Sequence, residues 1–407
     1  MADTSTHVIV GAALAGAKAA EALREEGFDG RVVLIGAERE LPYVRPPLSK
    51  DYLRGEQPRE KARVHPEGYY EEHDVELRTA TTVERIDTSD AAVVLSTGEH
   101  VGYDRLLLAT GAEPRRLEVA GSDLDGILYL RDLADADAIA ARLRAGARAV
   151  VVGGGWIGAE VAASARQKGV EVTLVERSEL PLAGVLGREI GQVYADVHRD
   201  HGVELVTEAT VEAFEGSAAV ERVRLAGGRA LDADFVVVGI GVLPRTKLAE
   251  DAGIATDDGV LVSERLETAT PGVFAAGDVA NALHPFYGRP LRIEHWANAL
   301  NQPATAARAM LGKPASYDRL PYFFSDQYDV GMEYTGYAAS WDQVVFRGDP
   351  AAREFIAFWL EDGRVLAGMN VNVWDVTDPI KALIQSRKPV DVAALRDPDV
   401  PLEQIAQ

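Results

Sequence analysis

Apolar residues along this chain form short, mostly β-branched runs that end at glycines. His7–Val10 is one such run; after it come Gly11 and Gly16, an alanine-rich stretch to Arg24 and a second apolar run, Arg31–Gly36. Short β-branched runs predict buried strands, and the alanine-rich stretch predicts a helix. The segment therefore predicts a strand, a glycine turn, a helix and a second strand, which together make a βαβ unit.

The same pattern returns about 140 positions later. Ala149–Val152 predicts a strand, a glycine-rich turn follows it, an alanine-rich helix runs to Lys168, and Val170–Val175 predicts the next strand. Two βαβ units of this kind predict an α/β protein with two Rossmann-like dinucleotide-binding domains, and hence two dinucleotide ligands.

The last part of the chain has a different composition. From about Pro321 aromatic and β-branched residues become frequent, among them Phe323, Phe324, Trp359 and Trp374. Because these residue types favour strands, we expect a separate α+β domain there.

Composition and charge exclude several functions. The 407 residues carry 42 Lys and Arg against 64 Asp and Glu, a net charge of −22, which disfavours nucleic acid as a partner. The chain contains no cysteine, which excludes thiolate metal sites, iron–sulfur ligation and a redox-active cysteine pair. No metal site is expected, and any redox chemistry must come from a cofactor. With neither a secretory leader nor an apolar run long enough for a membrane span, the sequence predicts a cytoplasmic protein with no membrane partner.

The second glycine turn carries the clearer dinucleotide signature. Gly153, Gly155 and Gly158 have the spacing that a tight turn, a close approach to pyrophosphate and helix-on-strand packing require. Glu176 stands at the end of the next strand, 21 positions beyond Gly155, where a carboxylate accepts hydrogen bonds from a ribose. Glu176 would repel a 2′-phosphate and so favours NADH over NADPH, although the neighbouring Arg177 moderates this preference. A βα turn without a ligand is the alternative.

The first glycine turn is less regular. Ala13 replaces the middle glycine of the pattern that begins at Gly11 and ends at Gly16. Glu38, just after the second strand, supplies a second candidate for a ribose ligand. The alternative for Glu38 is an ordinary solvated charge at a strand end.

Six further motifs point to one family. They are Leu41–Lys50, Leu108–Gly111, Gly153–Glu160, Thr270–Asp278, Arg292–Asn298 and Met369–Asp375. With them the chain resembles, over nearly its whole length, the FAD-dependent NADH:ferredoxin reductases of bacterial oxygenase systems, the family of putidaredoxin and rubredoxin reductases. The resemblance implies an FAD-binding domain formed by residues 1–112 and 245–320, an NAD-binding domain of residues 113–244 and a C-terminal α+β domain of residues 321–407.

The resemblance also implies a function. FAD would accept hydride from NADH and pass electrons singly to an iron–sulfur ferredoxin that serves a cytochrome P450 or a Rieske oxygenase. The lack of cysteine separates the chain from disulfide reductases, which need two cysteines beside the flavin, and from the peroxidase and oxidase branch, which needs one. Two alternatives stay open: an NADH oxidase or diaphorase, and a signalling flavoprotein resembling apoptosis-inducing factor. The sequence leaves the oligomeric state open, and a monomer is plausible.

By the same resemblance, particular residues contact the cofactors. Asp278 would bind the ribityl chain of FAD, Trp296 would border its isoalloxazine ring, and Val83 would flank the adenine unless it is an ordinary core residue. The residues expected at FAD are Gly11, Ala15, Gly16, Glu38, Arg45, Lys50, Val83, Arg131, Asp278 and Trp296. The residues expected at NAD are Gly153, Gly155, Ile157, Gly158, Glu160, Glu176, Arg177 and Gly241.

Lys50 and Glu160 are the expected catalytic pair, because the family has a lysine and a glutamate beside the reactive edge of the flavin. An ammonium group there stabilises the negative charge that arrives with hydride, and the carboxylate keeps the lysine charged. The alternative is that Lys50 caps a loop and Glu160 forms a surface ion pair.

Ferredoxin docking requires a local cationic surface on this acidic chain. Residues 281–320 hold five basic side chains against two acidic ones. The basic residues are Arg289, Arg292, Arg308, Lys313 and Arg319. We expect part of this segment, with Arg347 or Arg364, to receive the ferredoxin, and scattered solvated charge is the alternative.

Overall fold

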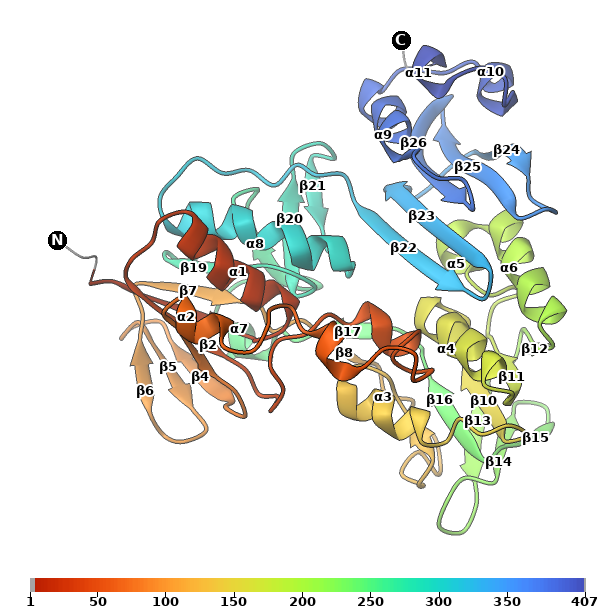
Figure 1. Ribbon diagram of the computed structural model, residues 1–407, viewed down its shortest axis with the longest axis horizontal. Helices are drawn as coiled ribbons and strands as arrows, with labels where there is room; N and C mark the ends of the chain where they lie inside the picture. The colour runs from red at the N-terminus through yellow and green to blue at the C-terminus, as the bar shows by residue number, and fades with distance from the viewer. Residues whose placement is uncertain (1–3, 406–407) are drawn as a thin grey trace. The chain divides into compact units, whose positions relative to one another are not determined.

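Residues 4–405 are described by the computed structural model drawn in Figure 1, and they divide into two units. Unit 1 comprises Met1–Arg45, Arg59–Glu113 and Val242–Pro321. Unit 2 comprises Pro46–Pro58, Pro114–Gly241 and Tyr322–Gln407. The chain passes between the units after Arg45, Pro58, Glu113, Gly241 and Pro321. The third and fourth of these passages lie at strand β8 (Ala112–Pro114) and at the start of strand β17 (Val242–Pro244).

Unit 1 is built on a parallel sheet. Its strands are β1 (Thr6–Val10), β2 (Arg31–Ile35), β3 (Val75–Arg78), β7 (Arg105–Leu108) and β19 (Val273–Ala275). Their order is β19-β7-β1-β2-β3, and every neighbouring pair is parallel. A parallel sheet is covered on both faces, so its strands are apolar at consecutive positions rather than at alternate ones. The buried faces of α1 (Leu14–Glu25) and α8 (Trp296–Met310), which contact each other, consist largely of alanine and allow close packing.

Two small sheets and short helices complete unit 1. The first sheet contains β4 (Val83–Asp87), β5 (Ala92–Leu95) and β6 (His100–Gly102), and the second contains β18 (Val260–Val262), β20 (Ala280–His284) and β21 (Arg289–Leu291). The short helices are η2 (Arg59–Ala62), α2 (Tyr69–Glu72) and α7 (Lys247–Asp251).

Unit 2 contains a second parallel sheet. Its strands are β9 (Ile127–Leu128), β10 (Arg148–Val152), β11 (Glu171–Val175), β12 (Glu204–Val206) and β16 (Phe235–Val238), in the order β12-β11-β10-β16-β9. Between β12 and β16 in the sequence, the strands β13 (Val211–Glu215), β14 (Arg222–Leu225) and β15 (Ala230–Asp232) form a separate three-stranded sheet. The helices are η1 (Pro46–Ser49), α3 (Leu133–Ala140), α4 (Trp156–Gln167), α5 (Ala183–Leu186) and α6 (Arg188–Asp200).

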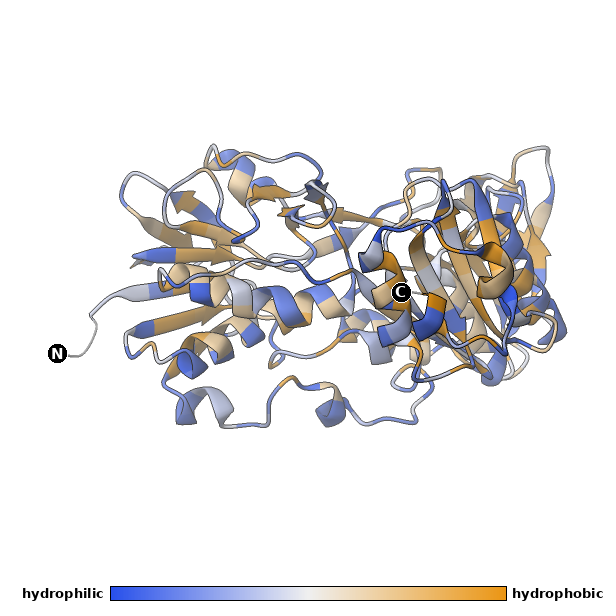
Figure 2. Cartoon of the chain, turned by 90° about the horizontal axis from the view of Figure 1, so that it is seen from above, coloured by the Kyte–Doolittle hydropathy of each residue, from blue (hydrophilic) through white to orange (hydrophobic). Residues whose placement is uncertain are grey.

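The C-terminal part of unit 2 is an antiparallel sheet with three helices. Its strands are β22 (Tyr322–Gln327), β23 (Val330–Gly336), β24 (Gln343–Asp349), β25 (Glu354–Glu361) and β26 (Arg364–Val371), in the order β22-β23-β26-β25-β24. The helices are α9 (Thr377–Ser386), α10 (Val392–Arg396) and α11 (Leu402–Ile405). Figure 2 shows the sheet strands largely in the hydrophobic colour, as expected for strands that form cores.

The antiparallel sheet shares its core with helices α5 and α6. One buried cluster contains Leu186 and Tyr194 from these helices together with Phe355, Trp359 and Met369 from the sheet. The indole Nε1 of Trp359 donates a hydrogen bond to the carbonyl of Leu186 at 2.9 Å. The C-terminal sheet is therefore packed onto the second dinucleotide-binding region rather than isolated from it.

The α/β fold with two Rossmann-like βαβ units is confirmed, and both units have the predicted strand and helix order. The expected division into three domains stays a prediction. The structure separates into two compact units, and residues 46–58, which were expected in the FAD-binding domain, belong to unit 2. Among residues 4–405, no helix has the length and hydropathy that a membrane crossing requires.

Candidate functional site

The first glycine turn joins β1 to α1 in unit 1. Gly11 has φ +113°, and a Cβ there would lie 2.1 Å from the carbonyl oxygen of Ala109. A Cβ at Gly16 would lie 1.9 Å from the carbonyl oxygen of Gly11. Both positions therefore require glycine for the chain to fold, and the turn presents the N-terminus of α1, an anion-binding feature. Ala13, the predicted irregularity, precedes the first residue of the helix.

A cavity of about 670 Å³ adjoins this turn and lies entirely within unit 1. Its volume is in the range of small-molecule sites, roughly 300–1,000 Å³. Four of the residues expected at FAD line it, namely Gly11, Glu38, Arg45 and Val83. The cavity, the glycine turn and the carboxylate at the end of β2 are the parts that an adenine dinucleotide needs, so the residues present fit FAD.

Glu38 is held at the wall of this cavity by two partners. Its Oε1 accepts a hydrogen bond from Arg45 Nη2 at 3.0 Å, and its Oε2 accepts one from the hydroxyl of Tyr43. Glu38 is therefore a fixed cavity residue and not a freely solvated charge. Val83 both lines the cavity and belongs to the hydrophobic core of unit 1.

The other six residues expected at FAD are not among those that line this cavity. Ala15 and Gly16 are buried in α1. Asp278 follows β19, and Trp296 is the first residue of α8. Arg131 and Lys50 belong to unit 2.

The glycines of the second turn, in unit 2, have two different roles: two are required for folding, and one leaves space for a ligand. A Cβ at Gly153 would lie 2.4 Å from the carbonyl oxygen of Gly239, and one at Gly158 would lie 1.9 Å from that of Gly153. At Gly155, by contrast, no atom of the described chain beyond the adjacent residues lies within 4 Å of the Cβ position. Gly153 and Gly158 are thus required for folding, whereas Gly155 leaves open space where a pyrophosphate can approach.

Glu176 stands directly after β11 and is fixed by the backbone. Its Oε2 accepts a hydrogen bond from the amide of Gly154 at 2.6 Å, and its Oε1 accepts one from the amide of Ser178 at 2.7 Å. Each carboxylate oxygen keeps a further lone pair, so Glu176 can still accept hydrogen bonds from a ribose. This geometry fits an NAD ribose beside the glycine turn.

The other residues expected at NAD surround the same turn or follow β16. Ile157 is 42% exposed in the first turn of α4, and Arg177 is exposed. Gly241 has φ +99°, and its carbonyl accepts a hydrogen bond from the amide of Arg115.

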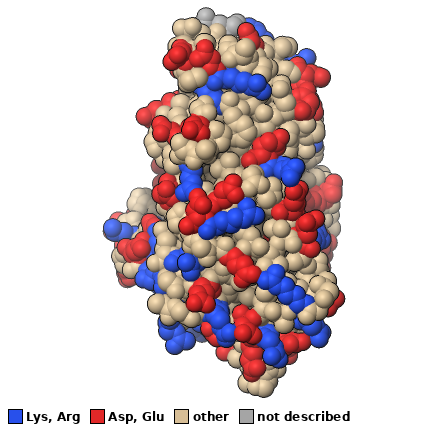
Figure 3. Space-filling model, turned by 90° about the vertical axis from the view of Figure 1, so that its right-hand side faces the viewer, with Lys and Arg blue, Asp and Glu red and all other residues tan. Residues whose placement is uncertain are grey.

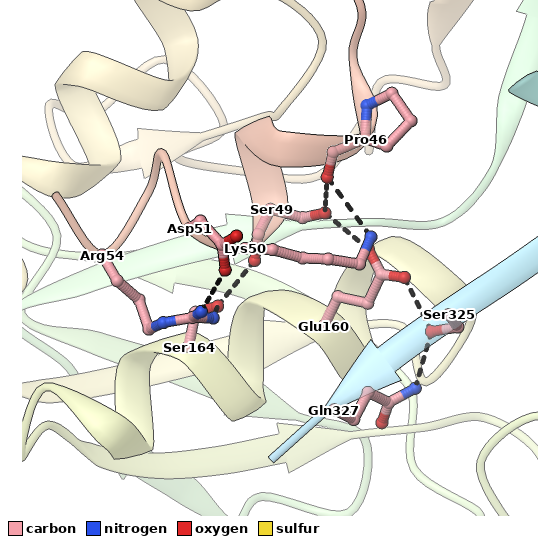
Figure 4. Close-up of polar contacts among 9 residues, drawn as sticks. All are labelled: Pro46, Ser49, Lys50, Asp51, Arg54, Glu160, Ser164, Ser325 and Gln327. Atoms are coloured by element: carbon pink, nitrogen blue, oxygen red, sulfur yellow. Dashed lines mark hydrogen bonds and ion pairs between the residues drawn. The ribbon is translucent and has the colours of Figure 1, made fainter. Parts of the chain in front are cut away.

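Lys50 and Glu160 form a buried ion pair within unit 2 (Figure 4). Lys50 follows η1, Glu160 lies in α4, and Nζ is 2.8 Å from Oε2. Their side chains are only 10% and 6% exposed. Lys50 also donates a hydrogen bond to the carbonyl of Pro46 at 3.2 Å. The surface ion pair considered as an alternative is not what the structure shows, because the two residues pair with each other and are buried. The bond to Pro46 means that Lys50 also caps the η1 turn.

Glu160 accepts two further hydrogen bonds. The hydroxyl of Ser49 donates to Oε2, and the hydroxyl of Ser325 in β22 donates to Oε1 at 2.7 Å. These serines were not predicted from the sequence, and neither were Gln327 and His198, which continue the network. A signal was present in β22, where Ser325 and Gln327 are polar residues at alternate positions whose side chains point into the core.

Arg292, Arg308 and Lys313 of the expected cationic docking segment form ion pairs within unit 1. Arg308 and Lys313 both form ion pairs with Glu26 at 2.8 Å. Arg292 pairs with Asp258 at 3.0 Å. Figure 3 draws another face, the right-hand side of the view in Figure 1, and on it basic and acidic side chains are intermixed. Because the single carboxylate of Glu26 faces both Arg308 and Lys313, these pairs leave part of the positive charge in place, and ferredoxin docking at this segment stays a prediction.

Acid should destabilise the protein through two histidines, the buried His198 and the half-buried His295. Burial lowers the pKa of His198 from 6.5 to about 4, and burial likewise lowers the pKa of His295 to about 4. In the unfolded chain these histidines are therefore protonated below about pH 6.5, whereas in the folded chain they are protonated only below about pH 4. The free energy of unfolding consequently falls as the pH drops from about 6.5 to about 4. At pH 5 the loss amounts to about 2 kcal/mol for each histidine.

Urea unfolding at pH 7 and pH 5 tests this expectation. In His198→Gln the decrease in the free energy of unfolding should be smaller by the contribution of one histidine. Equal pH dependence in the two proteins would contradict a neutral, buried His198.

Comparisons with known proteins define the class of this chain. Residues 5–303 match the family described as pyridine nucleotide-disulphide oxidoreductase, and residues 322–406 match the reductase C-terminal family. The chain belongs to the pyridine nucleotide-disulphide oxidoreductase family and is an oxidoreductase.

Within that class the chain is similar to ferredoxin reductases. It is 37% identical to a ferredoxin–NAD(P)(+) reductase of Sphingomonas sp., over 97% of this chain and 95% of that protein. It is 37% identical to putidaredoxin reductase of Pseudomonas putida, over 98% of this chain and 96% of that protein. Its structure resembles that of putidaredoxin reductase in a covalent complex with putidaredoxin, with a TM-score of 0.96 and 37% identity over 99% of this chain and 98% of the other.

Proposed function

We propose that this chain is an FAD-dependent NADH:ferredoxin oxidoreductase that supplies electrons to a cytochrome P450 or a Rieske oxygenase. The observation that carries the proposal is the presence of two dinucleotide turns and a buried Lys50–Glu160 pair in a chain that has no cysteine. Without thiols, this member of a disulphide oxidoreductase family has no disulfide chemistry of its own. Relatives named as reductase components of anthranilate and p-cumate dioxygenase systems support the choice of acceptor.

Unit 1 would hold FAD, and unit 2 would hold NADH. Gly11, Ala15 and Gly16 would receive the FAD pyrophosphate at the first turn, with Glu38 on the adenosine ribose and Val83 at the adenine. The remaining residues proposed for FAD are Arg45, Lys50, Arg131, Asp278 and Trp296. The residues proposed for NADH are Gly153, Gly155, Ile157, Gly158, Glu160, Glu176, Arg177 and Gly241.

FAD supplies, when bound, a carrier that takes up two electrons as hydride and releases them one at a time. Lys50 would contribute a fixed positive charge that favours the arrival of hydride, as preorganised charges do in other enzymes. Glu160 would keep Lys50 charged and oriented in a site from which water is largely excluded. The acceptor would be an iron–sulfur ferredoxin, and dependence on NADH is compatible with a cytoplasmic location.

Steady-state turnover with different acceptors tests this function. NADH oxidation should be fast when an iron–sulfur ferredoxin such as putidaredoxin is the acceptor. It should be slow when oxygen or a quinone is the only acceptor. Rapid NADH consumption without any ferredoxin would instead indicate an oxidase or diaphorase. A long-lived reduced complex with little turnover would indicate a signalling flavoprotein.

Removing the Glu176 carboxylate should change the nucleotide preference. In Glu176→Ala, kcat/KM for NADH should fall by about tenfold, the effect of losing roughly 1.4 kcal/mol of binding. The value for NADPH should fall less, because the repulsion of the 2′-phosphate is removed at the same time. Equal losses for both nucleotides would contradict the ribose role of Glu176.

A further inference from the structure

A chain of buried polar side chains runs through unit 2 from Glu160 to helix α6. Ser325 Oγ contacts Glu160 Oε1 at 2.7 Å, and Gln327 Nε2 contacts Ser325 Oγ at 3.3 Å (Figure 4). Beyond the residues drawn there, His198 Nε2 lies 3.0 Å from Gln327 Oε1, and the Tyr328 hydroxyl lies 3.3 Å from His198 Nδ1. Ser325, Gln327 and His198 are each no more than 2% exposed.

The carboxylate at one end fixes the direction of every hydrogen bond in this chain. An ionised carboxylate only accepts, so the hydroxyl proton of Ser325 points to Glu160. Ser325 Oγ must then accept from the amide group of Gln327, which turns the Gln327 carbonyl toward His198. That carbonyl needs a donor, so His198 carries its proton on Nε2.

At the far end of this hydrogen-bond network, the contact between His198 and Tyr328 is compatible with donors that all point toward Glu160. Burial lowers the pKa of His198 to about 4, which makes the ring neutral and leaves Nδ1 as an acceptor for the Tyr328 hydroxyl. All four donors thus point toward Glu160. Hydrogen bonds aligned in one direction polarise and strengthen one another, most of all in a buried environment.

We propose that Ser325, Gln327 and His198 are positioning residues that hold the Glu160 carboxylate in the orientation in which it pairs with Lys50. Oε2 receives Lys50 and Ser49, whereas Oε1 has Ser325 as its hydrogen-bond donor among the described residues. Without the Ser325 hydroxyl, a buried carboxylate oxygen would lack a donor, and the carboxylate would rotate or admit water. This inference rests on the proposed function for its effect on the reaction rate.

Two matched pairs of variants test the proposal. Ser325→Ala removes the donor to Glu160 at little change in volume, and Ser340→Ala is its control, because the Ser340 hydroxyl is exposed and bonded to Glu361 instead. His198→Phe keeps a ring without hydrogen-bonding groups, whereas His198→Gln retains a side-chain N–H that can donate to Gln327.

The first readout is spectroscopic and does not depend on turnover. In the protein as purified, before NADH is added, the infrared carboxylate band of Glu160 can be assigned by difference from Glu160→Gln. We expect this band to shift in Ser325→Ala and in His198→Phe, to return toward the wild-type position in His198→Gln, and to stay unchanged in Ser340→Ala.

The second readout is the rate of flavin reduction. At saturating NADH, the limiting rate should fall about tenfold in Ser325→Ala and about threefold in His198→Phe, with little change in KM for NADH. A wild-type carboxylate band in Ser325→Ala, or equal effects of Ser325→Ala and Ser340→Ala, would overturn the positioning role. Failure of the wild-type protein to react with NADH would overturn the proposed function and leave the infrared result standing on its own.

Discussion

Lys50→Met should lower the rate of NADH-driven flavin reduction by about 10²–10³-fold, the loss typical when one preorganised group that stabilises developing charge is removed. Methionine keeps the length and apolar stem of lysine, so the variant removes the charge with little change in packing. It also leaves Glu160 ionised and buried without a cationic partner, which costs about 3–5 kcal/mol of stability. Stopped-flow reduction at saturating NADH and urea unfolding measure the two effects.

The double variant Lys50→Met with Glu160→Gln separates stability from chemistry. Removing both charges should restore most of the lost stability, because no buried charge is left unpaired, while the reduction rate should stay low. A single Lys50→Met variant that reduces its flavin at the wild-type rate would show that the buried pair is structural.

Gly158→Ala should impair folding, whereas Gly155→Ala should impair NADH binding, although the two glycines lie in the same turn. The methyl group of Gly158→Ala would lie 1.9 Å from the carbonyl oxygen of Gly153, so the variant should lose at least about 3 kcal/mol of stability or fail to fold. Gly155 has φ −76°, which alanine adopts without strain, and its Cβ meets no other described atom within 4 Å.

Gly155→Ala should therefore fold normally and bind NADH poorly. Its methyl group would occupy the space where the pyrophosphate approaches, and KM for NADH should rise by about tenfold or more. Thermal unfolding and steady-state kinetics of the two variants provide the measurements. An unchanged KM in Gly155→Ala would contradict the assignment of this turn to NADH.

The two βαβ units could be predicted because their signals are local. Each parallel strand is buried on both faces, so Val150 and its neighbours form a continuous apolar run, and the turn glycines follow directly. The packing of the C-terminal sheet could not be predicted in this way. Trp359 contacts Leu186 across 173 positions, and no periodicity within either segment encodes such a contact.

The residues of the candidate site likewise fall into those that a local sequence pattern locates and those that depend on contacts between distant segments. The turn glycines, Glu38 and Glu176 follow strands directly and can be located from the local pattern. The pairing of Lys50 with Glu160 spans 110 positions and was expected only through the family resemblance. Arg308 is neutralised by Glu26, 282 positions away, so counting the charges within residues 281–320 gave an incomplete estimate of the surface.

The central claim is that a chain without thiols binds FAD and NADH and uses them for hydride transfer. An anaerobic titration with NADH, followed by visible absorption, tests it most directly. We expect a yellow protein whose flavin bands are bleached by stoichiometric NADH, with a long-wavelength charge-transfer band in the reduced complex. A folded protein that stays colourless after incubation with excess FAD, or a yellow protein that NADH does not bleach, would contradict it.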